Sequence, residues 1–149
     1  MSTAKIDKAI NTLQLHYYIN IIIVCLCFIL IFFKIVSLTN NPQTLSMALN
    51  QYSIIFSLLI IPAVLKYYSH QIKKATPTNI EQAFRVYKSA FYMRLYPISL
   101  VIIGNILLYA LSNNTNYIWI ALAIILFMFF CKPSVVELDN LIEKSKANE

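Results

Sequence analysis

Four long apolar runs limit the fold of this chain more than any other feature of its sequence. They cover residues 17–38, 45–65, 91–111 and 117–131. A helix needs about 20 apolar residues to cross a hydrocarbon core roughly 30 Å thick, which the first three runs supply. The fourth run is shorter and is bounded by Asn116 and Lys132. We therefore predict an all-α polytopic membrane protein with four transmembrane helices in one membrane domain, residues 1–149.

The positions of the acidic residues argue against one class of function, ion-coupled transport. The chain is 59% hydrophobic and 12% charged, so it carries more apolar surface than a soluble domain of 149 residues could bury. No Asp or Glu lies between Asp7 and Glu81 or between Glu81 and Glu137. Proton- and sodium-coupled transporters usually rely on an acidic residue inside the membrane. A self-contained secondary transporter is therefore disfavoured.

The connections between the runs predict how the helices pair. Residues 39–42 and 112–115 are brief polar links, so each flanking pair of spans should fold as an antiparallel hairpin. The two hairpins are joined by a longer basic segment. There Pro77 precedes the capping-box pattern of residues 78–81, which opens a helix.

We expect two further helices outside the spans. Residues 79–90 should form an amphipathic helix that lies at the cytoplasmic membrane interface and runs into span three, with Ile80, Phe84 and Tyr87 on one face. The alternative, which we favour for both helices, is that they cover the inner surface of the bundle. The Lys132-Pro133 pair should end span four. A short C-terminal helix then follows, with Val135, Leu138 and Leu141 on one side.

Basic residues predict the orientation. Outside the spans they lie in the two termini and the central connection, with Lys34 alone on the other side, so the positive-inside rule places both termini in the cytoplasm of a bacterial inner membrane. We expect Arg94 to extend its charge to the interface. The net charge of +6 suits anionic lipid headgroups or an acidic partner, and no soluble module remains to bind nucleic acid. The candidate contact residues are Lys66, Lys73, Lys74, Arg85, Lys88 and Arg94.

Three polar residues deep in the apolar runs are the main site candidates. Asn105 follows Gly104, where a neighbouring helix could approach closely, and Ser53 and Ser57 form a small-xxx-small pair. The structural interpretation is a set of interhelix contacts worth about 1 kcal/mol each. The functional interpretation is a polar lining for a substrate path.

No residue pattern predicts catalysis, a cofactor or a metal site. His16 and His70 fall at the cytoplasmic ends of spans one and two, where two imidazoles would suit haem or a metal, but no third ligand lies nearby. Cys25, Cys27 and Cys131 lie in or at the end of apolar runs and read as buried free thiols.

A loose pattern extends over the full chain. Residues 94–97 (Arg-Leu-Tyr-Pro), Asn105, Tyr109 and residues 132–134 (Lys-Pro-Ser) together resemble small four-span bacterial inner-membrane proteins with no assigned activity. The resemblance implies the same topology and adds no mechanism, cofactor or site.

The leading hypothesis is a non-enzymatic membrane component, either an accessory subunit or a small homo-oligomer. One alternative is a pore or exporter component lined by Ser53, Ser57 and Asn105. Another is an immunity-type protein that protects its host from a membrane-active toxin.

Overall fold

The computed structural model describes residues 3–36 and 46–147, and this part of the chain is entirely helical. It contains five helices and no strand, which confirms the all-α prediction. The predicted link at 39–42 lies outside the described residues, as do the last residues of the first predicted span and the first residue of the second. The helices are α1 (Thr3–Phe32), α2 (Met47–Lys74), α3 (Ile80–Ser112), α4 (Thr115–Phe129) and α5 (Val135–Ala147).

Three of these helices, α1, α2 and α3, are long and apolar enough to cross a membrane. The sequence predicted four such spans. The helix in the fourth run, α4, is apolar but has only 15 residues, which at 1.5 Å per residue is about 22 Å. It ends at Phe129, before the Lys132-Pro133 pair that was expected to stop it.

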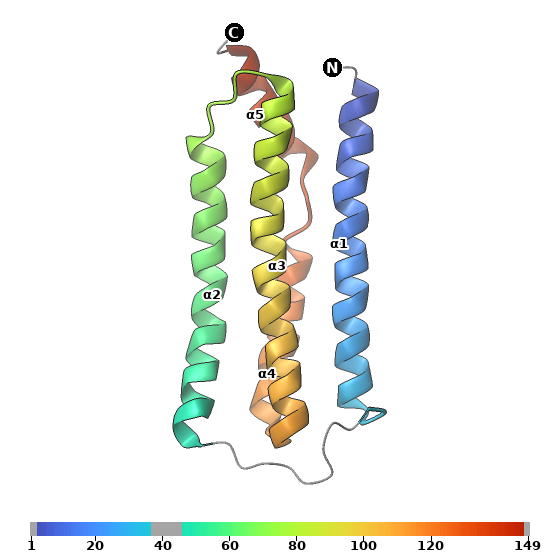
Figure 1. Ribbon diagram of the computed structural model, residues 1–149, viewed down its shortest axis with the longest axis vertical. Coiled ribbons are helices and arrows are strands. Elements are labelled where there is room, and N and C mark those ends of the chain that lie inside the picture. The colour runs from blue at the N-terminus through green and yellow to red at the C-terminus, as the bar shows by residue number, and fades with distance from the viewer. Residues whose placement is uncertain (1–2, 37–45, 148–149) are drawn as a thin grey trace.

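The bundle is organised around α3, which contacts α1, α2, α4 and α5. Figure 1 shows α3 between α1 and α2, with α4 behind it. In the apolar window of each candidate span, 44% of α3 is buried, against 11% of α1 and 17% of α2. The first two helices therefore do not pack together as the predicted hairpin. Each packs on α3 instead.

Helices α3 and α4 run antiparallel and pack against each other. The turn between them rests on two asparagines. Asn113 takes the left-handed conformation (φ 53°, ψ 18°) and donates its N–H to the carbonyl of Tyr109, and asparagine is one of the few residues that tolerate this conformation. Asn114 then caps α4 by accepting a hydrogen bond from the N–H of Asn116 at 3.1 Å.

The predicted amphipathic segment 79–90 is the first part of α3 and runs into the third apolar run without a break, as expected. Ala83, Tyr87 and Ala90 are buried, and α5 packs against this part of the bundle through Leu138 and Leu141. With 33 residues, α3 is about 50 Å long, so it extends well past the length of a bilayer core. Of the two surroundings expected for this segment, the structure favours protein, because α5 packs against it.

The start of α3 also differs in detail from the expected capping box. Both the N–H and the hydroxyl of Thr78 donate to the side-chain oxygen of Gln82, at 3.1 and 2.8 Å. Asn79, at the N-cap position, makes no side-chain capping bond. Glu81 instead forms an exposed ion pair with Arg85 at 3.7 Å. The chain thus enters α3 through Thr78 and Gln82.

Both described ends of the chain and the α2–α3 connection lie at the same end of the bundle, the upper end in Figure 1. We call this the termini end. The α3–α4 turn lies at the opposite end, which we call the far end.

Candidate functional site

Arg94 is the centre of the first candidate site. Its side chain is only 7% exposed. The guanidinium donates from Nη2 to the carbonyl oxygen of Cys131 at 2.9 Å and lies over the ring of Tyr68, with Cζ 4.1 Å from the ring centroid. The expectation that the Arg94 side chain extends outward is therefore wrong, because its guanidinium stays inside the bundle. A main-chain carbonyl and an aromatic face hold its charge inside the protein.

Three tyrosines from three different helices contact the same stretch of chain as Arg94. The hydroxyl of Tyr17 in α1 lies 3.0 and 3.2 Å from the carbonyl oxygens of Met128 and Phe129. The hydroxyl of Tyr87 in α3 donates to the carbonyl of Ser134 at 3.0 Å and accepts from its N–H at 2.8 Å. We call Tyr17, Tyr68, Tyr87, Arg94 and residues 128–137 the Arg94 cluster.

The third tyrosine brings a negative charge into the cluster. Tyr68, in α2, donates from its hydroxyl to Oε2 of Glu137 at 2.6 Å. Within residues 3–36 and 46–147, no carboxylate lies within 4.0 Å of Arg94, and the Nε of Arg94 is buried without a hydrogen-bond partner. The two charges are thus joined through the tyrosine rather than by direct contact. At the height of Arg94 along the bundle, the cluster attaches α5 and the end of α4 to α1, α2 and α3.

The second candidate site contains the polar residues singled out from the sequence. The amide nitrogen of Asn105 donates to the Ser57 hydroxyl at 2.8 Å and to the Val101 carbonyl at 2.9 Å. The Ser57 hydroxyl in turn donates to the carbonyl of Ser53 at 2.8 Å. The structure therefore brings Asn105 and Ser57 together across α2 and α3. Ser53 takes part only through its main chain.

A shallow groove of about 150 Å³ opens beside this contact. We call it the α2–α3 groove. A Cβ added at Gly104 would meet no atom within 4 Å, so the close helix approach expected at Gly104 is not made within the chain. The Oδ1 atom of Asn105 is buried and has no hydrogen-bond partner among the described residues. The groove is lined by Ser53, Phe56, Ser57, Leu100, Val101, Gly104, Asn105 and Leu108.

Two further interhelix contacts were missed by the sequence reasoning. The hydroxyl of Ser99 donates to Oδ1 of Asn20 at 2.6 Å, which joins α3 to α1. The hydroxyl of Tyr117 donates to the side-chain oxygen of Asn50, which joins α4 to α2. Asn20 and Asn50 both lie within apolar runs of the sequence. Their polarity within apolar runs was the available signal.

The remaining basic candidates are exposed and are not gathered into one pocket. Lys66, Lys73 and Lys74 lie on the second half of α2, while Arg85 and Lys88 lie on the first part of α3. All five lie toward the termini end. These residues distribute positive charge over that end of the bundle and do not form an anion-binding pocket.

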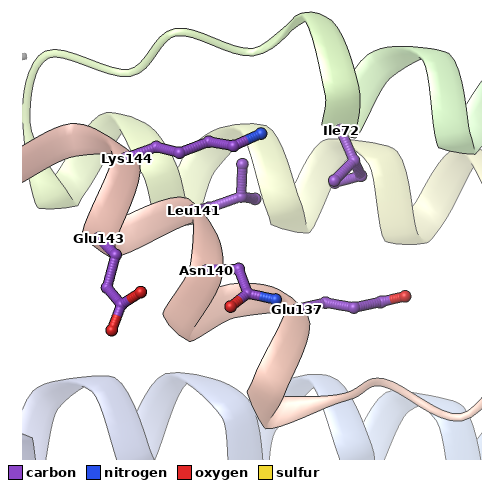
Figure 2. Close-up of a pocket in the computed structure, with 6 residues that line it drawn as sticks. All are labelled: Ile72, Glu137, Asn140, Leu141, Glu143 and Lys144. Carbon is purple, nitrogen blue, oxygen red and sulfur yellow. The ribbon is translucent and has the colours of Figure 1, made fainter. Parts of the chain in front are cut away.

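An open groove of about 530 Å³ lies beside α5 near the end of α2. Figure 2 shows Leu141 and Lys144 on the side of α5 that faces α2, with Glu143 pointing away from Ile72. Glu137 at this groove is already held by Tyr68. The lining residues are Ile72, Glu137, Asn140, Leu141, Glu143 and Lys144.

The histidines and cysteines are not assembled into a common site. His16 packs edge to face on Tyr92 with ring centroids 5.9 Å apart, and His70 is exposed on α2, on the other side of α3. In the part of the chain that the structure describes, no three His, Cys, Asp or Glu side chains are grouped as a metal would require. The three cysteines are free thiols.

Comparison with protein-family models, curated proteins and solved structures finds no match to this chain. The interpretation of the fold and of the two sites therefore depends on the geometry of this chain alone.

Proposed function

We propose that this chain is a non-enzymatic integral membrane protein of a bacterial inner membrane that acts by association, as a small homo-oligomer or as an accessory subunit. The observation that carries the proposal is the uncovered apolar surface of the outer helices. Only 11% of the span window of α1 and 17% of that of α2 are buried. Lipid or other membrane helices must cover the rest.

The direction of the polar side chains supports this proposal. Asn20 and Ser57, on the two outer helices, both bond to α3. In lipid such groups need a partner within the protein, and each bond of this kind contributes about 1 kcal/mol. The exposed side chains of α1 and α2 include many large apolar ones, which suit contact with other membrane components.

Four crossings are part of the proposal. From Arg94 to the α3–α4 turn, α3 has about 19 residues, or roughly 27 Å, close to the thickness of a bilayer core. α4 runs antiparallel along this same stretch and reaches Arg94 through Cys131. We infer that α4 and the residues after it cross the membrane together.

The proposed orientation places the termini end in the cytoplasm. Exposed lysines and Arg85 lie toward that end, while Lys34 lies past the far end of α1, and the positive-inside rule assigns the more basic side to the cytoplasm. There the basic residues would contact anionic headgroups, or an acidic partner, at about 1 kcal/mol per residue near the surface.

Two measurements test the proposal together. Native mass spectrometry directly from membranes should return an oligomer or a complex with a second protein, with anionic lipid bound. Reporter domains fused to each terminus should both report the cytoplasm. A monomer without a partner at every loading would contradict association, and a reporter signal from the periplasm would contradict the orientation.

A second candidate function is a pore or exporter component, which the α2–α3 groove favours because Ser53, Ser57 and Asn105 all line it. This function predicts solute flux through liposomes that contain the protein, and loss of that flux in Asn105→Leu. Flux that is unchanged by the substitution would remove this candidate.

A further inference from the structure

We infer that the link between α4 and α5 binds the phosphate of an anionic phospholipid at Lys132. The inference rests on the proposed function, from which it takes the position of the bundle in the membrane, and it goes further by naming one lipid contact. The residues concerned are exposed on the link and beside it: Tyr18, Phe130, Lys132, Val135 and Val136. We call them the Lys132 patch.

Buried and exposed side chains alternate along the link. Cys131 and Pro133 are buried, whereas Phe130 and Lys132 are exposed, an alternation typical of non-helical, extended chain. The inner side of the link is held by Arg94, which donates to the carbonyl of Cys131 at 2.9 Å. Phe130 and Lys132 are therefore directed away from the bundle.

The ammonium group of Lys132 has no acidic partner. Its Nζ lies 5.7 Å from the centroid of the Tyr18 ring on α1, within the range of a cation–π contact. Within residues 3–36 and 46–147, no carboxylate lies within 4.0 Å of Lys132, and the Tyr18 hydroxyl makes no hydrogen bond. An ammonium and a phenol hydroxyl therefore remain free in one patch, and phosphate oxygens accept from both.

The side chains around this charge are apolar. Phe130 is 85% exposed and Val136 is 67% exposed. Water alone would leave this apolar surface uncovered, whereas hydrocarbon alone would leave the ammonium group unsolvated. The boundary between headgroups and acyl chains satisfies both, because phosphates lie directly above the chains. The mixed character of the patch thus favours a phospholipid.

The depth of the link agrees with this occupant. Cys131 bonds to Arg94, which lies roughly 27 Å from the α3–α4 turn and so near the end of the hydrocarbon core. Ser134 bonds to Tyr87, which precedes Arg94 by about 10 Å along α3. The headgroup layer is about 5–8 Å thick on each side of the core. Lys132 therefore lies at the level where lipid phosphates begin.

The charges near the link favour an anionic lipid over a zwitterionic one. Arg94 places a second positive charge beside the residue before Lys132. The nearby acid Glu137 is bonded to Tyr68 on α2. A zwitterionic headgroup carries its own cation, which competes with Lys132 for the phosphate, whereas an anionic headgroup such as that of phosphatidylglycerol does not.

Fluorescence quenching in vesicles tests the inference. The full chain is placed in mixed vesicles of phosphatidylglycerol and phosphatidylcholine, with Trp119→Phe to remove its single tryptophan and Phe130→Trp as the reporter. Either lipid is supplied in brominated form, since bromine quenches a tryptophan that it contacts. Phosphatidylglycerol should be preferred at the reporter about fivefold, which corresponds to about 1 kcal/mol.

Charge variants test the role of Lys132 itself. Lys132→Gln should abolish the preference for phosphatidylglycerol, and Lys132→Arg should keep it. Lys66→Gln is the matched control, because Lys66 is exposed on α2 and lies toward the same end of the bundle. It removes an equal charge from elsewhere on that end and should leave the preference at the reporter unchanged.

A second pair of reporters tests the depth of the link. Val136 lies in the first turn of α5, whereas Glu143 is exposed about two turns farther along the same helix. Lipid brominated near its headgroup should quench Val136→Trp at least about twofold more than Glu143→Trp.

The outcomes separate this inference from the proposed function. Equal quenching by the two brominated lipids, or a preference that Lys132→Gln and Lys66→Gln lower equally, would overturn the inference. A reporter that no lipid quenches would also overturn it, since water or another protein would then cover the patch, and so would equal quenching of the two depth reporters. If native mass spectrometry still showed an oligomer or a complex, the proposed function would stand without this site. A monomer that still prefers phosphatidylglycerol would contradict the proposed association and support the site.

Discussion

The guanidinium of Arg94 lies over the ring of Tyr68, 4.1 Å from its centroid, and the hydroxyl at the other end of that ring bonds to Glu137 at 2.6 Å. One tyrosine from α2 thus stands between a positive charge on α3 and a negative charge on α5. Because Tyr17 and Tyr87 bond to the main chain nearby, the level of Arg94 is where the five helices are held together.

Removal of the guanidinium should destabilise the whole bundle. Arg94→Ala deletes a hydrogen bond from a charged group and a cation–π contact, so we expect a loss of about 2–4 kcal/mol in the free energy of unfolding. Thermal unfolding in detergent measures it. Arg85→Ala is the control, since Arg85 is 81% exposed in its ion pair and its loss should change stability by less than about 0.5 kcal/mol. Equal stability of the two variants would contradict this role.

Tyr87→Phe should loosen the attachment of α5. The substitution removes both hydrogen bonds between the Tyr87 hydroxyl and the main chain of Ser134, which is half-buried. Each bond of this kind contributes about 0.5–1.5 kcal/mol. Hydrogen exchange should quicken at the amides of α5 and less elsewhere. Tyr96→Phe is the control, because Tyr96 is 54% exposed. Unchanged exchange in α5 would show that the bonds do not hold it.

The contact between Asn105 and Ser57 should appear as a coupling energy. In a double-mutant cycle with Asn105→Ala and Ser57→Ala, we expect about 0.6–1.7 kcal/mol, the range for hydrogen bonds between membrane helices. The comparison cycle pairs Asn105→Ala with Ser99→Ala, since Ser99 bonds to Asn20 instead; it should give less than about 0.5 kcal/mol. The prediction fails if the two cycles give the same value.

Gly104→Ala should stabilise the isolated chain. An added Cβ would meet nothing within 4 Å, and alanine in a helix interior is favoured over glycine by about 0.5–1 kcal/mol. Unfolding in detergent, at less than one chain per micelle, tests this. Ala121→Leu is the contrast, because Ala121 is fully buried and overpacking there should cost about 1–3 kcal/mol. Destabilisation by Gly104→Ala would contradict the prediction, because it would mean that other atoms of the protein already occupy the space beside Gly104.

The helices themselves could be predicted because their determinants are local. Runs of apolar residues indicate buried or membrane helices wherever they fall in a fold. The Asn113-Asn114 pair provides a turn and a cap, and the Lys132-Pro133 pair keeps α4 from continuing into α5. Asn105 and Ser57 could be singled out because a polar group in an apolar run must find a partner.

The neighbours of each helix could not be predicted in the same way. When nearly every face of a helix is apolar, its periodicity does not mark which side meets protein and which meets lipid. The short link at 39–42 predicted a hairpin of the first two spans, whereas α1 and α2 each pack mainly on α3. For residues 79–90 the sequence left open the membrane interface and the inner surface of the bundle, and only the contact with α5 favours the bundle.

The sequence by itself determined that the chain is helical, where its apolar segments lie and which polar groups need partners. It did not predict that α1 begins at Thr3 or that α2 continues to Lys74. Only the tertiary structure decided that α3 is central and that Arg94 is buried. Tyr17 bonds to residues 111 and 112 positions away, and Arg94 to one 37 positions away. Such contacts depend on where distant segments of the chain meet in space. Hydropathy is a property of neighbouring residues and does not encode these meetings.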